Sequence, residues 1–353
     1  MFIVKFNKQR DSKMIGRSLK SFGLCALCAV LAGGMQVAAE ELTVSVWGGG
    51  YGETWKKVAV DPFVAQTGIK VTVDMGPANQ RLSKLLASRG GIDLLFITDH
   101  QMAVAKSRGL LEAFDPAQVP NAANLIDFAR DPLGDKLCPA ITVLGIGFAY
   151  NKDHFPTPPK AWSELMRNDL KAPQAFMDIG FSVAPSMLIQ LAEINGGSID
   201  NIDPGIKAMG DRKSRARFFK LFEVLDWINR GEVSVAPMLN TFVKRDPNVP
   251  LRFAFPEKDA IGVVNMACVI KGTKNKLAAE RFLNYYLSDE VQSRMAATFG
   301  EMPVTKTAKI PEGIPYEVLS PDRISRLKFY DPVKIGAQRQ RWIDKFEEAV
   351  VTK

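Results

Sequence analysis

Histidine and cysteine are scarce in this chain of 353 residues. The two histidines are His100 and His154, and two of the four cysteines, Cys25 and Cys28, fall within the first 39 residues. The sequence has no histidine and cysteine spacing typical of a zinc site, so we expect no metal and no cofactor. It also lacks a Gly-x-Ser-x-Gly elbow, a Gly-Lys-Ser/Thr phosphate loop and a recognisable nucleophile–base pair. These absences argue against an enzyme.

Long apolar runs are missing as well, since a membrane-spanning helix needs about 20 such residues. The N-terminus instead has six basic residues, a short apolar core at residues 22–30 and small residues at 37–39. This pattern predicts a signal peptide over residues 1–39, cleaved before Glu40. The long basic region leaves Met14 as an alternative start to Met1. We expect an exported protein that is soluble once cleaved.

An excess of one charge sign is absent once the predicted signal peptide is set aside. The full chain has 46 basic and 38 acidic residues and a net charge of +8. Residues 1–39 hold six of the basic residues and one acid, which leaves 40 against 37. Ordinary solvated surfaces explain such a balance, so we expect no nucleic-acid partner.

The remaining 314 residues are long enough for roughly two domains, and no internal repeat or low-complexity segment is present. Two cysteines remain, Cys138 and Cys268. In an oxidising compartment they could form a disulfide, or they could be two buried free thiols, and the sequence leaves both open.

Alternating strand and helix patterns predict an α/β fold. Strands are expected at residues 42–47, 69–73 and 93–97, with helices at 53–66, 81–88 and 101–108. Short connections between them imply a mostly parallel sheet, and ligands bind such sheets beyond the carboxyl ends of the strands. Later patterns predict strands at 138–151, 233–236 and 261–271, and helices at 185–194, 212–229, 277–287, 290–299 and 324–351.

Two adjacent segments carry a family resemblance. Residues 144–151 (LGIGFAYN) predict a buried strand with glycines where something comes close, and residues 158–165 (PPKAWSEL) a turn into a short helix. Together they resemble the crossover of bacterial solute-binding proteins of the spermidine/putrescine type, which serve ABC importers. Further segments resemble that family in the same order, at residues 109–111, 114–115, 119–121, 195–197, 201–205, 231–233, 271–275 and 285–288.

The resemblance implies a type II periplasmic-binding-protein fold with two lobes. Each lobe would be a mostly parallel sheet flanked by helices, with crossover strands at the hinge. Lobe 1 would hold residues 40–144 plus 272–311, and lobe 2 residues 145–271 plus 312–353. The expected function is a monomeric periplasmic receptor that closes around a small solute and delivers it to an inner-membrane ABC permease with its ATPase. A periplasmic enzyme and a chemosensory receptor are the alternative classes.

In that family the ligand contacts come from the turn after strand one, the end of strand three, the crossover and three loops of lobe 2. Carried over by position, this implies the candidates Trp47, Gly48, Gly49, Gly50, Tyr51, Thr98, Asp99, His100, Val143, Gly145, Asp178, Ser182, Leu239, Asn240, Thr241 and Asn265. For His100 a ligand-facing ring and a ring at the rim of the cleft both remain open.

The candidate lining departs from that of polyamine binders, which need carboxylates for ammonium groups and aromatic faces for methylene chains. Leu239 and Thr241 stand where the family has a tryptophan and often an acid, and residues 263–265 (VVN) stand where it has Trp-Met-Asp. Asp99 and Asp178 are the remaining candidate carboxylates. A polyamine would therefore be poorly compensated.

The glycines at 48–50 suggest a different cargo. Between a strand and a helix they could present backbone N–H groups to a carboxylate or phosphonate, or they could only form a tight turn. We expect a zwitterionic or anionic compound that contains an amine, such as an amino acid derivative, an opine-like compound or an aminophosphonate. A polyamine is the alternative cargo.

Overall fold

A computed structural model describes residues 40–87, 91–220, 222–317, 319 and 321–351. The described residues belong to one unit, and the predicted signal peptide, residues 1–39, lies outside them. Within the described part of the chain, no helix combines the length and apolarity that crossing a membrane would need.

The N-terminal part of the unit is an alternating βα arrangement, as the sequence predicts. Strands β1 (Glu41–Trp47), β2 (Lys70–Gly76) and β3 (Leu94–Thr98) pair in parallel, with β1 between the other two. The intervening helices are α1 (Gly49–Trp55), a π-helical segment (Lys56–Val60), α2 (Asp61–Thr67), α3 (Ala78–Ala87) and α4 (Asp99–Ser107).

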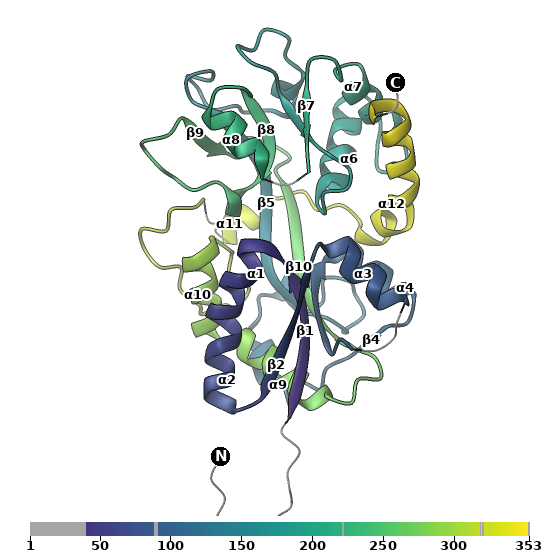
Figure 1. Cartoon of the computed structure of the whole chain (residues 1–353), viewed down its shortest axis with the longest axis vertical. Coiled ribbons are helices and arrows are strands. Elements are labelled where there is room, and N and C mark those ends of the chain that lie inside the picture. Colours follow the sequence, from purple (N-terminus) through teal and green to yellow (C-terminus); the bar gives the residue numbers. More distant parts are fainter. Residues whose placement is uncertain (1–39, 88–90, 221, 318, 320, 352–353) are drawn as a thin grey trace, which may run out of the picture. The chain divides into compact units, whose positions relative to one another are not determined.

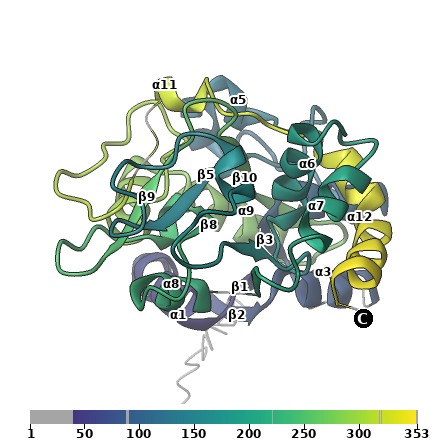
Figure 2. The same cartoon turned by 90° about the horizontal axis from the view of Figure 1, so that it is seen from above.

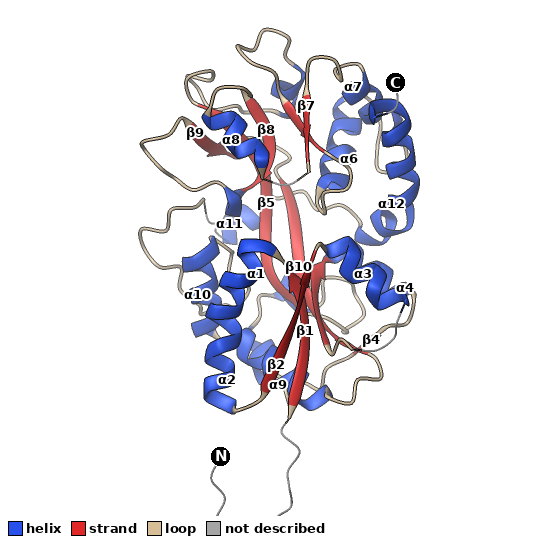
Figure 3. Ribbon diagram, in the orientation of Figure 1, coloured by secondary structure: helices blue, strands red, loops and turns tan. Residues whose placement is uncertain are grey.

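Two long strands cross the molecule. Strands β5 (Ala140–Asn151) and β10 (Ile261–Ile270) are buried along their whole length and pair antiparallel. The sheet order is β2-β1-β3-β10-β5-β8, in which β8 is Val235–Leu239. Short strands β4 (Leu111–Glu112) and β9 (Leu251–Ala254) pair with β10 and β5. Figures 1 and 3 show β5 and β10 linking the region around β1 to the region around β8.

The second region has a small parallel pair and its own helices. Strand β6 (Ala175–Met177) pairs with β7 (Arg217–Phe219). The helices here are α6 (Ala184–Ile194), α7 (Asp203–Gly210), α8 (Glu223–Asn229) and α12 (Pro332–Phe346), followed by a π-helical end (Glu347–Val351). Figure 2 shows α6, α7 and α12 together on one side of β5 and β8.

The remaining helices contribute buried apolar residues to the same cluster as β1 and β3. They are α5 (Asp127–Arg130), α9 (Lys276–Tyr286), α10 (Asp289–Phe299) and α11 (Pro321–Ile324). Three-residue-per-turn helices lie at Pro120–Asn124, Trp162–Met166 and Asn240–Phe242.

The buried apolar residues fall into two clusters, which we call the first core and the second core. Along β5 the first core ends at Val143 and the second begins at Leu144. Near the C-terminus Leu327 still belongs to the first core, and the second resumes at Ile335. The crossover strands therefore join two separately packed regions.

The predicted helix over 212–229 is wrong. Residues 217–219 form β7, and α8 begins only at Glu223. A helix would place Phe218 and Phe222 one turn apart on the same face. In the structure Phe218 stands opposite Phe176 of β6, and Phe222 is 43% exposed. Hydrogen bonding to a partner strand distant in the sequence outweighs the local helical pattern here.

Three smaller differences concern the starts of two helices and the exposure of one side chain. The first helical segment begins at Gly49 rather than at 53, so the three glycines precede or occupy its first turn. Leu86, which a helix over 81–88 places one turn after Leu82 and on the same face, is 40% exposed. The C-terminal helix α12 begins after Asp331, whose carboxylate accepts hydrogen bonds from the backbone N–H groups of Val333 and Lys334. A cap of this kind fixes where a helix starts.

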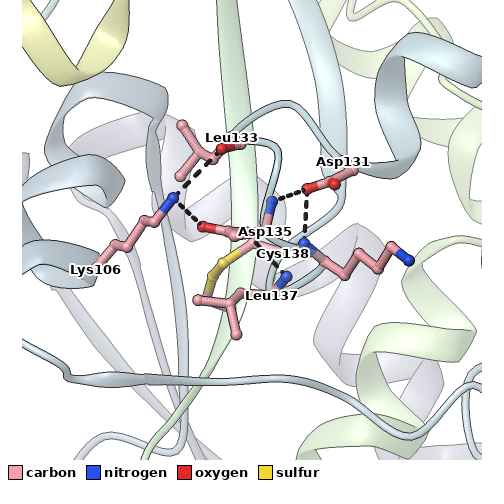
Figure 4. The surroundings of a disulfide bond; sticks show 8 residues. Lys106, Asp131, Leu133, Asp135, Leu137 and Cys138 are labelled. Atoms are coloured by element: carbon pink, nitrogen blue, oxygen red, sulfur yellow. Dashed lines mark hydrogen bonds and ion pairs between the residues drawn. A yellow bond between two sulfur atoms is a disulfide. The ribbon is translucent and has the colours of Figure 1, made fainter.

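Cys138 and Cys268 form a disulfide with Cα atoms 4.9 Å apart, which answers the question that the sequence left open. Both side chains are buried in the first core. Figure 4 shows the loop beside the bond, where Lys106 Nζ lies 2.6 Å from Asp135 Oδ2 and Asp131 accepts backbone hydrogen bonds. The bond ties the segment before β5 to β10 across 130 residues of sequence.

Candidate functional site

The two cores meet along β5 and β10, and several predicted residues lie at this junction. Asn265 of β10 stands opposite Thr98 at the end of β3 and opposite Thr142 of β5. On the other side of the junction the backbone N–H of Gly145 donates to Asn240 Oδ1 at 2.9 Å. The structure therefore brings the ends of β3 and β8 close to the central parts of β5 and β10.

The side chains of Trp47, at the end of β1, and Tyr51, in α1, contact one another. Their rings meet edge to face with centroids 6.0 Å apart, and Tyr51 also packs on Phe299 of α10 at 4.5 Å. Both side chains are partly buried. Their proximity follows from the turn into α1, which places them four residues apart across the start of a helix.

The glycines after β1 have a clear conformational reason. Gly49 has φ of +68°, and a Cβ on Gly48 would lie 3.1 Å from the backbone N of Gly76 at the end of β2. A Cβ on Gly50 would meet nothing within 4 Å. The tight turn explains Gly48 and Gly49, whereas Gly50 has no such requirement.

The residues at the end of β3 hydrogen-bond among themselves. Thr98 Oγ1 donates to Gln101 Oε1 at 2.7 Å, and Asp99 Oδ1 accepts from the backbone N–H of His100 at 2.6 Å. The ring of His100 is buried, with Nδ1 3.4 Å from Asp99 and Nε2 without a hydrogen-bond partner among the described residues. The His100 ring is therefore enclosed by the protein and not exposed to solvent.

Asp178 and Ser182 lie in the segment between β6 and α6, and both are partly buried. Asp178 Oδ1 accepts from the backbone N–H of Gly180 at 2.8 Å. The carbonyl of Gly180 in turn accepts a 3.2 Å hydrogen bond from Asn79 Nδ2 of α3. This segment therefore contacts helix α3, and the Asp178 carboxylate already has a hydrogen-bond partner within the segment.

The remaining predicted residues are buried. Val143 forms an isolated bridge with Met302, and Leu239 stands opposite Ile146. Asn240 Nδ2 donates to the carbonyl of Glu317 at 2.6 Å, and Thr241 is buried beside it. Asn265 Oδ1 is buried without a hydrogen-bond partner among the residues described. Of these side chains, Asn265 retains unused hydrogen-bonding capacity.

Arg81 was missed by the sequence reasoning. This residue of α3 is 2% exposed, and its guanidinium carbon lies 5.3 Å from the centroid of the Trp47 ring. Burial lowers the pKa of Arg81 to about 10, and Asp74 opposes that shift. Arg81 lies one turn before Leu85 and shares the buried face of α3 with Leu82 and Leu85.

Glu301 was missed too, because it stands alone after Gly300, where no periodic pattern applies. It is 4% exposed, and Oε1 accepts a 2.8 Å hydrogen bond from the Tyr51 hydroxyl. Burial raises the pKa of Glu301 to about 7, although the Tyr51 hydrogen bond lowers it. Burial and this carboxyl group also hold the pKa of Tyr51 well above its usual range.

Two surface hollows lie away from these residues. One of about 630 Å³ is lined by residues of α7 and the C-terminal segment, and it contains the ion pairs Lys207–Asp211 and Lys345–Asp203. The other, about 190 Å³, is lined by Gly109, Leu110, Ile270 and Lys271. Neither includes a predicted binding residue. The described residues contain no group of three or more His, Cys, Asp or Glu side chains placed to hold a metal ion.

Comparisons with known proteins agree with this architecture. The spermidine/putrescine-binding periplasmic protein of Salmonella typhimurium is 23% identical over 255 residues, which cover 68% of this chain and 72% of that protein. A candidate 2-aminoethylphosphonate-binding periplasmic protein of the same species is 24% identical over 268 residues, covering 71% and 74%.

A solved structure of an ABC transporter protein from Clostridium perfringens matches with a TM-score of 0.73 and 24% identity, over 88% of this chain and 99% of that one. The predicted periplasmic-binding-protein fold is confirmed. The prediction of mostly parallel sheets is wrong, because β10 pairs antiparallel with β3 and β5, and β5 pairs antiparallel with β8. A family model described as bacterial extracellular solute-binding protein matches residues 90–326. The chain therefore belongs to the family of bacterial extracellular solute-binding proteins.

Proposed function

We propose that this protein is a periplasmic receptor that captures a small solute between two lobes and delivers it to an inner-membrane ABC permease with its ATPase. Family membership supports the solute-binding role. The two cores joined by β5 and β10 support the two lobes, and the Asn79–Gly180 contact supports their closure on one another. The receptor acts as a monomer and performs no chemistry on its cargo.

Export to the periplasm has support beyond the signal-peptide pattern. The relatives named above are periplasmic proteins. The Cys138–Cys268 disulfide also suits an oxidising compartment, where such bonds persist.

The cargo we propose is zwitterionic or anionic and contains an amine. The observation that carries this proposal is the guanidinium of Arg81 over the ring of Trp47. A polyamine would use that aromatic face for its methylene chain and would bring further positive charge to a buried cation. A carboxylate or phosphonate would instead be attracted. The Salmonella relative named for 2-aminoethylphosphonate offers a cargo of this class.

A thermal-shift screen of the protein without residues 1–39 tests the proposal. A solute that binds only the folded state raises the unfolding temperature by mass action. We expect shifts with amino acids, opine-like compounds or aminophosphonates, and weaker ones with putrescine and spermidine. A shift with the polyamines alone would favour the alternative cargo, which the other Salmonella relative is named for. Turnover of a bound compound would contradict the absence of chemistry.

A further inference from the structure

A buried basic side chain and a buried acidic side chain flank the Trp47–Tyr51 pair. The guanidinium of Arg81 lies against Trp47, and the carboxyl group of Glu301 is hydrogen-bonded to Tyr51. Trp47 and Tyr51 are themselves in edge-to-face contact. The four side chains therefore form a continuous row, with a cation at one end and an acid at the other.

The guanidinium of Arg81 is fixed by the protein but not fully used. Its Nε donates to the carbonyl of Gly76 at 3.0 Å, and Nη1 donates to the carbonyl of Phe96 at 2.8 Å and to Ser45 Oγ at 3.3 Å. Its Nη2 is buried without a hydrogen-bond partner among the described residues. Asp74, which opposes the lowering of the Arg81 pKa, is linked to Arg81 through Ser45 Oγ and is also paired with Lys84.

The two oxygens of the Glu301 carboxyl group also differ in their hydrogen bonds. Tyr51 satisfies Oε1, whereas Oε2 is buried without a hydrogen-bond partner in the part of the chain described. Burying a charged group without hydrogen-bond partners costs more free energy than burying a neutral group in the same way. A carboxyl group with a purely structural role would therefore have partners for both of its oxygens. A bound group that fills these positions would remove the cost at both ends of the row.

We propose that Arg81 and Glu301 are the two poles that recognise the solute. Arg81 Nη2 binds a carboxylate or phosphonate, Glu301 Oε2 binds an ammonium group, and Trp47 and Tyr51 cover the carbon chain between them. This inference rests on the proposed receptor function and narrows its cargo to compounds that carry the acid and the amine at opposite ends of a short chain. A polyamine would place a second cation against Arg81, and a dicarboxylate a second anion against Glu301.

Paired probes with and without the amine test each pole. Calorimetric titration would compare 2-aminoethylphosphonate with ethylphosphonate, and 4-aminobutanoate with butanoate. We expect Glu301→Gln to lower the affinity for the amine-bearing probe at least about tenfold, the usual effect of losing a charge-assisted hydrogen bond. The affinity for the probe without the amine should stay within about twofold of the wild-type value. The glutamine carbonyl still accepts from Tyr51, so the fold is retained.

Arg81→Gln should lower the affinity for both probes of a pair at least about tenfold. Arg81→Lys should lower it less, because the positive charge remains. Glu348→Gln replaces an exposed carboxylate and is the matched control; it should change the affinity for neither probe. Circular dichroism and the unfolding midpoint check that each variant folds. If Arg81→Gln does not fold, the Glu301→Gln comparison decides the inference by itself.

The outcomes separate this inference from the function on which it rests. If Glu301→Gln lowers the affinity for the amine-bearing and deaminated probes equally, or lowers neither, the proposed roles of Arg81 and Glu301 are contradicted. The proposed receptor function would not be affected by that result. Wild-type protein that binds only putrescine or spermidine would do the same. Wild-type protein that binds none of the screened small solutes would overturn both.

Discussion

Glu301 shows how burial changes the chemistry of a single carboxyl group. Its pKa rises from an ordinary 4.5 to about 7, mainly because burial removes water from the charged form. Its hydroxyl partner Tyr51 and the nearby buried Tyr286 have raised pKa values for the same reason. Without a ligand, this site therefore holds a proton up to near-neutral pH.

The raised pKa makes a prediction about stability. Because the folded state keeps the Glu301 proton and the unfolded state loses it above about pH 4.5, the free energy of unfolding should fall as pH rises from about 4.5 to 7. Glu301→Gln removes this loss, so its stability relative to wild type should increase over that window by as much as about 3 kcal/mol. Urea unfolding of the ligand-free protein at several pH values measures it.

Glu348→Gln provides the comparison, because this carboxylate is exposed. Its stability relative to wild type should stay nearly constant from pH 4.5 to 8. A difference between Glu301→Gln and wild type that does not change with pH would mean that Glu301 titrates as a solvated carboxylate.

At the scale of elements, the crossover strands depend on their glycines. A Cβ on Gly145 would lie 2.5 Å from the Phe255 ring, and one on Gly147 would lie 2.5 Å from the carbonyl oxygen of Ala254 in β9. On β10, a Cβ on Gly262 would lie 2.2 Å from the Phe329 ring. The prediction of close approach at the glycines of residues 144–151 is confirmed.

Gly147→Ala should destabilise the protein by about 1–3 kcal/mol, since the new methyl group meets backbone that cannot turn away as a side chain would. Thermal or urea unfolding measures the change. Gly50→Ala is the matched control, because a Cβ there meets nothing within 4 Å and alanine is favoured over glycine in a helix. Equal effects of the two substitutions would show that close packing at β9 is not the cause.

At the scale of the whole molecule, helices from the two cores touch. Helix α12 carries Ile335 and Trp342 into the second core, whereas α4 carries Met102 into the first. They meet at Gly336, where a Cβ would lie 2.8 Å from the carbonyl oxygen of His100. We therefore interpret this contact as part of the closed arrangement of the proposed lobes.

Gly336→Val should open the proposed cleft without touching the solute. The valine would collide with α4, and an overpacking cost of about 1–3 kcal/mol borne by the closed state alone would weaken solute affinity roughly tenfold or more. Calorimetry measures the affinity, and small-angle scattering with saturating solute should show a larger radius of gyration than wild type.

Ala337→Val adds valine at the next position, which is exposed, and should leave affinity and radius unchanged. A Gly336→Val protein that binds as tightly as wild type would mean that the α4–α12 contact is not coupled to closure.

Much of the fold could be predicted from local patterns. The crossover β10 and the helices α9 and α10 lie within a residue of their predicted bounds, because long apolar runs and end signals such as Gly300 mark them. The 212–229 segment could not be predicted in this way. Its apolar residues fit a helix locally, and only the distant strand β6 draws residues 217–219 into a sheet.

Part of the candidate site could likewise be predicted from the sequence, and part could not. The sequence by itself determined the α/β class and the family resemblance, and it singled out Trp47, Tyr51 and Asn265, because these depend on neighbours in the chain. Only the tertiary structure decided that Arg81 and Glu301 flank those aromatic rings and that Cys138 bonds to Cys268. Burial and unfilled hydrogen bonds depend on contacts between residues up to 250 positions apart, as in the Tyr51–Glu301 pair, which no local pattern encodes.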